Sequence, residues 1–110
     1  MSKRIVVPKN EAAVEMYNYN MYSEEDVLIL PINEEDFCWL YDNQVIEEIN
    51  NRCHSLIDEY EEEDLSGEQI IVALAVISDF MKKYNTPILN DIKNMLTEAK
   101  KRNSIICFEL

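Results

Sequence analysis

Glycine and proline are scarce in this sequence. It contains one glycine and three prolines among 110 residues. Tight turns depend heavily on these two residue types, so the composition argues against a loop-rich or all-β fold. Apolar residues make up 47% of the chain, which is more than a disordered acidic segment carries. We therefore expect a single globular domain that spans residues 1–110.

Long apolar runs are also missing. The longest, residues 70–77, has eight residues, whereas a membrane-spanning helix needs roughly 18–20. The basic residues at the N-terminus are not followed by the apolar core of a secretion signal. We therefore expect a cytoplasmic protein that does not bind membranes.

Cysteine occurs three times, as Cys38, Cys53 and Cys107. An odd number without the C-x-x-C spacing fits neither a disulfide framework nor a zinc site. Each cysteine has apolar neighbours in the sequence, so we expect three buried, reduced thiols.

Residue types that support catalysis are few. The single histidine, His54, follows Cys53, but adjacent residues on a helix point about 100° apart and do not face each other. The chain has no phosphate-binding P-loop and no glycine-rich dinucleotide pattern. Its acids lack the spacing and the central glycine of a calcium loop. We predict no enzymatic activity, cofactor or metal site, although 22 acidic residues leave a hydrolytic carboxylate pair open.

Positive charge is nearly absent from the middle of the chain. Residues 11–79 contain 19 acids and one base, Arg52, whereas the segments before and after them are both net positive. The acids are densest at residues 58–64, DEYEEED. Charge asymmetry of this kind bears on partners and association rates, not on the fold. It also argues against direct nucleic-acid binding, because phosphates would meet a surface of their own sign.

Three short apolar runs predict strands. They lie at residues 4–7, 27–32 and 105–108. Pro31 places the end of the second run at a sheet edge or outside the hydrogen-bonded ladder. Residues 17–22, YNYNMY, alternate polar and aromatic side chains, so a further strand is an alternative there.

Helices are predicted between these strands. Asn10 could cap a short helix over residues 11–17, and Asn33 is a good N-cap for the acidic turn that follows it. A hairpin strand over FCWLY, residues 37–41, is the alternative to that second helix. Apolar residues three and four apart predict a longer helix over residues 43–60.

The second half of the chain has clearer helix signals. Ser66 and Gln69 match the capping-box pattern, and the apolar run that follows predicts a helix buried on all sides. A buried parallel strand is the alternative for that run. Thr86 and Pro87 then suit the start of a last helix, and Asn103 suits its end. The fold class is therefore α/β or α+β, with about three strands packed by about four helices in a single pair of layers.

Residues 58–64 are expected at the C-terminal end of the helix over residues 43–60 and in the loop beyond it. Acids at that end oppose the helix dipole, and neighbouring like charges cost about 0.2–0.5 kcal/mol each. Such a cluster is either a solvated face or a surface for a positively charged partner, with aromatic residues as anchors. The predicted partner-binding residues are Asp58, Glu59, Tyr60, Glu61, Glu62, Glu63 and Asp64, together with Glu47, Glu48, Glu68 and Trp39.

The closing stretch, NTPILNDIKNMLTEAKKRNSIICFEL, is similar in layout to the last helix and strand of bacterial immunity proteins from contact-dependent growth inhibition systems. The length and acidity of the chain and its lack of catalytic motifs also resemble that type of protein. The resemblance implies a one-to-one complex with a toxin domain, often a basic nuclease, and no catalysis by this chain. Barstar-like inhibitors also end with a helix and a strand, but their acidic binding segment is not matched here, so no residue role is carried over.

Two other functions fit the same composition. An acidic protein can imitate nucleic acid and block a host defence enzyme, in which case DNA or RNA would compete for the partner. Alternatively, the acids serve only solubility, and the chain is an adaptor or oligomerisation domain. A dedicated toxin partner would argue against both.

Overall fold

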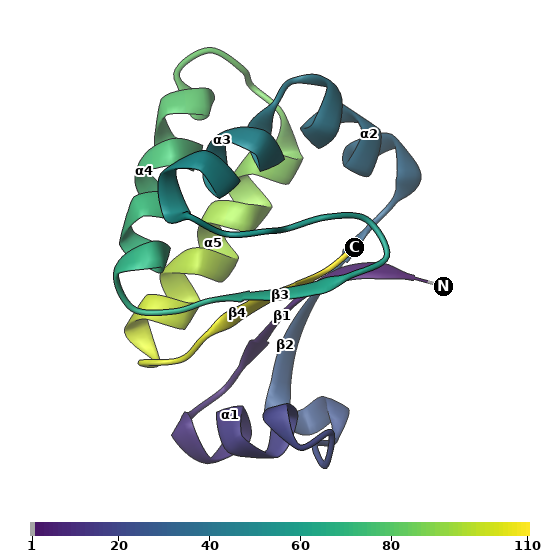
Figure 1. Ribbon diagram of the computed structural model, residues 1–110, viewed down its shortest axis with the longest axis vertical. Helices are drawn as coiled ribbons and strands as arrows, with labels where there is room; N and C mark the ends of the chain where they lie inside the picture. The colour runs from purple at the N-terminus through teal and green to yellow at the C-terminus, as the bar shows by residue number, and fades with distance from the viewer. Residues whose placement is uncertain (1) are drawn as a thin grey trace.

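The computed structural model describes residues 2–110, and its centre is a four-stranded antiparallel sheet (Figure 1). The strand order across the sheet is β2–β1–β4–β3. The strands are β1 (Lys3–Pro8), β2 (Val27–Ile32), β3 (Glu62–Leu65) and β4 (Ile106–Glu109). The helices are α1 (Glu11–Asn18), α2 (Glu34–Asp42), α3 (Val45–Cys53), α4 (Glu68–Met81) and α5 (Pro87–Lys101), with a 3-10 turn, η1, at Glu24–Asp26. The mixed class is confirmed, with one strand and one helix more than predicted.

The two faces of the sheet are covered differently. Side chains alternate between the faces of a strand, so neighbours in sequence belong to different cores. Ile5 and Phe108 face the large core under α2 to α5, whereas Val6 and Cys107 face a small cluster with Tyr17 of α1. Figure 1 shows α3, α4 and α5 on one side of the sheet and α1 on the other. The predicted single pair of layers therefore omitted α1.

Local capping signals predicted several helix starts correctly. The side chain of Asn10 accepts a hydrogen bond from the Ala13 N–H at 2.8 Å, and Asn33 accepts one from the Asp36 N–H at 2.8 Å. The α2 helix rules out the hairpin strand at residues 37–41, and the end of α1 rules out the strand at residues 17–22. Both helices begin at a side-chain cap, which stabilises their first turn.

The predicted helix over residues 43–60 is wrong in its second half, because α3 ends at Cys53. His54 adopts a left-handed conformation with φ of 55°, and the chain reverses there. The Asn50 side chain stabilises the reversal: its Oδ1 accepts from the Ile57 N–H at 2.8 Å, and its Nδ2 donates to the Ile57 carbonyl at 2.9 Å. Leu56, expected on the apolar stripe, is 76% exposed.

The start of α4 keeps half of the predicted capping box. Gln69 Oε1 accepts from the Ser66 N–H at 3.1 Å, while Gly67 is the residue before the helix. The other end of the same amide donates to the Cys53 carbonyl at 3.1 Å, which fastens α4 to the end of α3. The helix is not buried on all sides as predicted, since Ile71 is 49% exposed.

The prediction of three buried thiols is correct for two of them. Cys53 and Cys107 are buried, whereas Cys38 is exposed, and all three are free. In α2 the core contacts come from Phe37 and Leu40, so Cys38 lies on the outer side of the helix. Apolar neighbours in sequence do not share a helix face, which is why the pattern misled.

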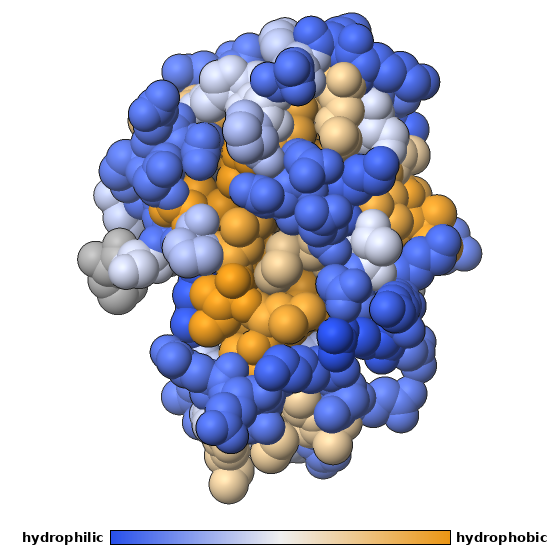
Figure 2. Space-filling view, turned by 180° about the vertical axis from the view of Figure 1, so that it is seen from behind, coloured by the Kyte–Doolittle hydropathy of each residue, from blue (hydrophilic) through white to orange (hydrophobic). Residues whose placement is uncertain are grey.

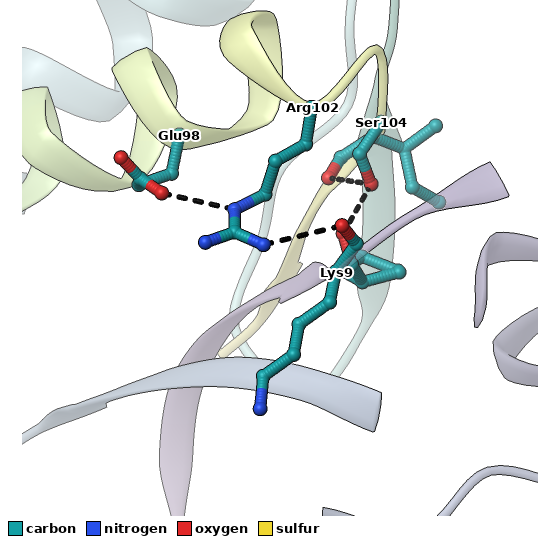
Figure 3. Close-up of polar contacts among 6 residues, drawn as sticks. Lys9, Glu98, Arg102 and Ser104 are labelled. Carbon is teal, nitrogen blue, oxygen red and sulfur yellow. Dashed lines mark hydrogen bonds and ion pairs between the residues drawn. The ribbon is translucent and has the colours of Figure 1, made fainter. Parts of the chain in front are cut away.

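A polar junction joins the end of α5 to the end of β1 (Figure 3). Arg102 donates to the Glu98 carboxylate at 2.9 Å and to the Lys9 carbonyl at 3.3 Å. The buried Ser104 hydroxyl donates to the Pro8 carbonyl at 2.6 Å. These bonds place the start of β4 against the end of β1, so the chain enters the sheet between β1 and β3.

Candidate functional site

The acidic segment, residues 58–64, lies in a loop and in an edge strand of the sheet. Its last three residues belong to β3, which pairs with β4 only. Tyr60 is 83% exposed and has a φ of 67°, in the left-handed region that large side chains seldom adopt. The predicted location at a helix C-terminus is therefore wrong, whereas a loop is present over residues 58–61, and the last three acids lie on the edge of the sheet.

Lys3 fixes the beginning of the acidic segment. Its Nζ lies 3.2 Å from a carboxylate oxygen of Glu59 and 3.0 Å from one of Glu34 on α2. The same Nζ lies over the ring of Phe37 at 4.6 Å and over that of Tyr60 at 5.6 Å. The hydrogen bond to Glu34 raises the pKa of Lys3, because the charged ammonium is the form that donates it.

Two other acids of the segment also have structural roles. The Tyr41 hydroxyl donates to Asp58 at 3.2 Å, and burial, aided by the Asp58 charge, raises the pKa of Tyr41 to about 12. Glu63 accepts a hydrogen bond from the Leu56 N–H at 2.7 Å and so holds the loop after α3. Together with Glu59, half of the six acids hold the segment in place.

The remaining three acids face solvent. Glu61, Glu62 and Asp64 are exposed. The Leu110 N–H donates to the Glu61 carbonyl at 3.3 Å, in register with the β3–β4 pairing. Because antiparallel pairs alternate, the backbone N–H and C=O groups of Glu62 and Asp64 point to the free edge. This edge therefore carries two carboxylates beside its open backbone groups.

A charged cluster on the α1 face of the sheet adjoins the segment. Arg4 donates to Glu109 at 2.7 Å and to the Tyr22 hydroxyl at 2.7 Å. The Tyr17 hydroxyl donates to the second carboxylate oxygen of Glu109. The hydrogen bond to Glu109 raises the pKa of Arg4, and burial raises the pKa of Tyr17. No pattern in the sequence indicates this cluster, because Arg4 and Glu109 become neighbours only through the strand pairing.

Glu62 lines three neighbouring surface cavities. The largest, of about 490 Å³, lies between Lys3, Tyr60 and the C-terminal Leu110. The other two extend from Glu62 towards Tyr17. The region is therefore concave and mainly acidic, with Tyr60 projecting beside it.

The structure places the other predicted binding residues elsewhere. Glu48 lines a groove between α3 and α4 together with the bases Arg52 and Lys83. Glu68 lines a different groove with Lys100. Neither groove includes a residue of the acidic segment.

The last two predicted residues lie on α2 and α3. Trp39 is half-buried and packs edge-on against Tyr84, with ring centroids 5.3 Å apart. Glu47 is exposed on α3. Trp39 thus makes a packing contact within the protein. Glu47 lies on α3 with Glu48, whereas Glu62 lies on β3.

Within residues 2–110, no three His, Cys, Asp or Glu side chains are grouped so that they could hold a metal ion. No helix in this part of the chain has the length and apolar character needed to cross a membrane. Comparisons with protein-family models, curated proteins and solved structures found no match for the chain. What the protein binds has to be inferred from its own surface.

Proposed function

We propose that the protein is an immunity-type inhibitor that binds a basic toxin domain, of the nuclease class, in a one-to-one complex. One observation carries this proposal. The acidic segment presents Glu61, Glu62 and Asp64 to solvent beside the exposed Tyr60, while Lys3 and two hydrogen-bonded acids hold the backbone beneath them.

An acidic surface whose backbone is fixed in this way suits the recognition of a cationic cleft. Because the segment is already ordered, binding does not have to supply the free energy of fixing a loop. Opposite fields also steer the encounter, and association rates of about 10⁸–10⁹ M⁻¹s⁻¹ are reached at low salt in such pairs. Tyr60 is the aromatic type that anchors interface centres. We expect no direct binding of nucleic acid, since the segment would repel phosphates.

Charge reversal of the three exposed acids tests the proposal. In the variant Glu61→Lys, Glu62→Lys, Asp64→Lys, Glu63 is kept because its carboxylate holds the Leu56 N–H. The control is Glu15→Lys, Asp42→Lys, Asp91→Lys, which changes the net charge equally at scattered exposed acids. The tagged proteins are used to capture partners from the native host at low and high salt, with intact-mass readout.

The expected result is one basic protein, captured at one-to-one stoichiometry by the parent and the control but lost by the first variant. Capture by all three proteins would mean that the acidic segment is not the binding surface. If only abundant basic proteins appear, and all are lost on adding salt, the acids serve solubility. If the partner is a host enzyme that added DNA or RNA displaces, the protein is a nucleic-acid mimic instead.

A further inference from the structure

The second edge of the sheet, β2, is apolar and open. Its sequence, VLILPI, contains no charged residue, and Leu28, Ile29 and Leu30 are only half-buried. Figure 2 shows apolar surface in the middle of the back face, where β2 runs between the helical layer and α1 in Figure 1. Most proteins cover or charge such an edge, because its free backbone groups can pair with another strand.

The hydrogen-bond alternation of the β1–β2 pair identifies the free backbone groups. The Lys9 N–H donates to the Asp26 carbonyl at 2.9 Å, one step beyond the Pro8–Val27 pair and in the same register. In an antiparallel ladder, every second pair exchanges such bonds. Residues 28 and 30 therefore bond to β1, whereas the backbone groups of residues 27, 29 and 31 point away from it. The prolines at positions 8 and 31 agree with this assignment, since both fall in the non-bonded pairs.

The free edge offers more acceptors than donors. The Val27 N–H already donates to the Glu24 carbonyl in η1, and Pro31 has no N–H. The edge thus presents one N–H, from Ile29, and three carbonyls, from Val27, Ile29 and Pro31. An added antiparallel strand would have to supply three N–H groups at alternate residues and one carbonyl.

The charges at the two ends of β2 indicate what should flank such a strand. Glu24, Glu25 and Asp26 precede β2, and an acidic triplet at residues 34–36 follows Asn33. By register, the nearest bases are Lys3 and Arg4 in β1 and Lys9 directly after it, and Arg4 is already paired with Glu109. Six acids therefore outnumber three bases, and an incoming strand meets net negative charge at each end.

We propose that the β2 edge binds an extended segment of another protein, with a short uncharged β-type centre and Lys or Arg at both ends. The partner strand would continue the sheet beyond β2. The binding is separate from the proposed function of the acidic segment, which lies at the opposite edge of the same sheet. Either site can therefore fail in experiment without the other.

A second copy of the chain is a poor occupant of this edge. In an antiparallel pair of β2 strands centred on Ile29, the two Ile29 residues would exchange two bonds. Val27 would then face Pro31 of the other copy, with no free N–H on either residue. The acidic triplets of the two copies would also meet at both ends, which is unfavourable. The donor shortage and the charges both select a different, basic partner.

The test uses the synthetic peptide KRTVTVTRK and ¹⁵N-labelled protein, with amide chemical shifts followed during titration. We expect shifts concentrated at residues 27–33 and slower solvent exchange of the Ile29 N–H. The first control peptide, EETVTVTEE, keeps the centre and should bind at least about tenfold more weakly. The second carries N-methyl groups at the alternate residues that would donate, and should lose binding.

Three outcomes would overturn the proposal: no shifts with the basic peptide, shifts confined to residues 58–65, or equal binding by the N-methylated peptide. A dimer of the protein that the peptide disrupts would also overturn it, since a second copy would then be the occupant. The variant Ile29→Pro removes the one free donor and should weaken binding of the basic peptide. If that variant does not fold, the peptide controls still decide the question.

Discussion

The two edge strands of the sheet, β2 and β3, differ in chemistry, although each is antiparallel to the one strand with which it pairs. β3 is short, and its outward backbone positions are the acids Glu62 and Asp64. β2 is longer, uncharged and half-buried along its centre. Acids beside open backbone groups discourage unspecific strand pairing, and β2 has no such protection within its length. On the two proposals above, β3 would meet its partner through charge and β2 through backbone pairing.

The edges also differ in how they are held to the molecule. Both strands pair along their full length, but β3 has one buried side chain, Leu65, whereas the longer β2 has Val27 and Ile32 buried at its two ends. The acidic edge therefore depends on one core contact and on the polar anchors around it.

Leu65→Ala should have the largest effect. Removing a fully buried leucine side chain lowers the free energy of unfolding by about 2–5 kcal/mol, and β3 has no other apolar anchor. The matched change in β2, Leu30→Ala, should cost less because Leu30 is half-buried. Urea denaturation of both variants measures the difference. Equal losses would show that β3 is held by more than this contact.

Tyr17→Phe should have an intermediate effect. The substitution removes the hydroxyl that donates to Glu109 but leaves the Arg4 bond to the same carboxylate. Hydrogen bonds to charged groups contribute about 1.5–3 kcal/mol, and the remaining Arg4 bond places the expected loss near the lower figure. Thermal unfolding measures it, with Tyr19→Phe as the control, since Tyr19 is 71% exposed. An unchanged melting temperature would mean that water stabilises the Tyr17 hydroxyl in the unfolded chain as well as Glu109 does in the folded protein.

Alkaline pH should loosen the acidic side of the molecule gradually. Tyr41 has its pKa raised from 10.0 to about 12, so the unfolded chain loses this proton first. The stability contributed by neutral Tyr41 is complete below pH 10 and is lost as the pH rises towards about 12. Denaturation at a series of pH values should show this fall, with a smaller slope in Tyr41→Phe. A variant with the parental slope would assign the fall to the other groups whose pKa burial raises, which are Tyr17, Cys53 and Cys107.

Removing the exposed acids of β3 should change stability least. The change Glu62→Thr, Asp64→Thr removes the exposed acids of β3 and should alter the free energy of unfolding by less than about 0.5 kcal/mol. It should nevertheless increase self-association, measured by sedimentation, because the edge loses its like-charge repulsion. Ile29→Lys places a charge on β2 and should reduce any self-association of the parent. If neither variant changes sedimentation, edge charge does not control assembly.

The sequence predicted the elements whose signals are local. Asn10, Asn33 and the Thr86–Pro87 pair marked helix starts, and Asn103 adopts the predicted left-handed conformation with φ of 53°. Their caps involve residues within one turn, so the information is contained in a short stretch of chain. The apolar run at residues 27–32 also predicts its strand from a short stretch of chain, and Pro31 correctly indicates the edge of a sheet.

The candidate site could be predicted in part. Exposure of Tyr60 and of three acids follows from their charge and clustering. The structural use of Asp58, Glu59 and Glu63 was hidden, because their partners Tyr41, Lys3 and Leu56 approach only after the chain reverses.

The sequence by itself determined the charge asymmetry, the capped helices and the apolar strands, since each follows from residue type and local spacing. Tertiary structure decided that DEYEEED would be a sheet edge and not a helix end. Asn50 satisfies the backbone of Ile57, and β4 supplies the hydrogen-bonding partner for residues 62–65. The helical periodicity of residues 43–60 predicts neither contact. The pairing with β4 joins positions that are distant in sequence, so no local pattern indicates it.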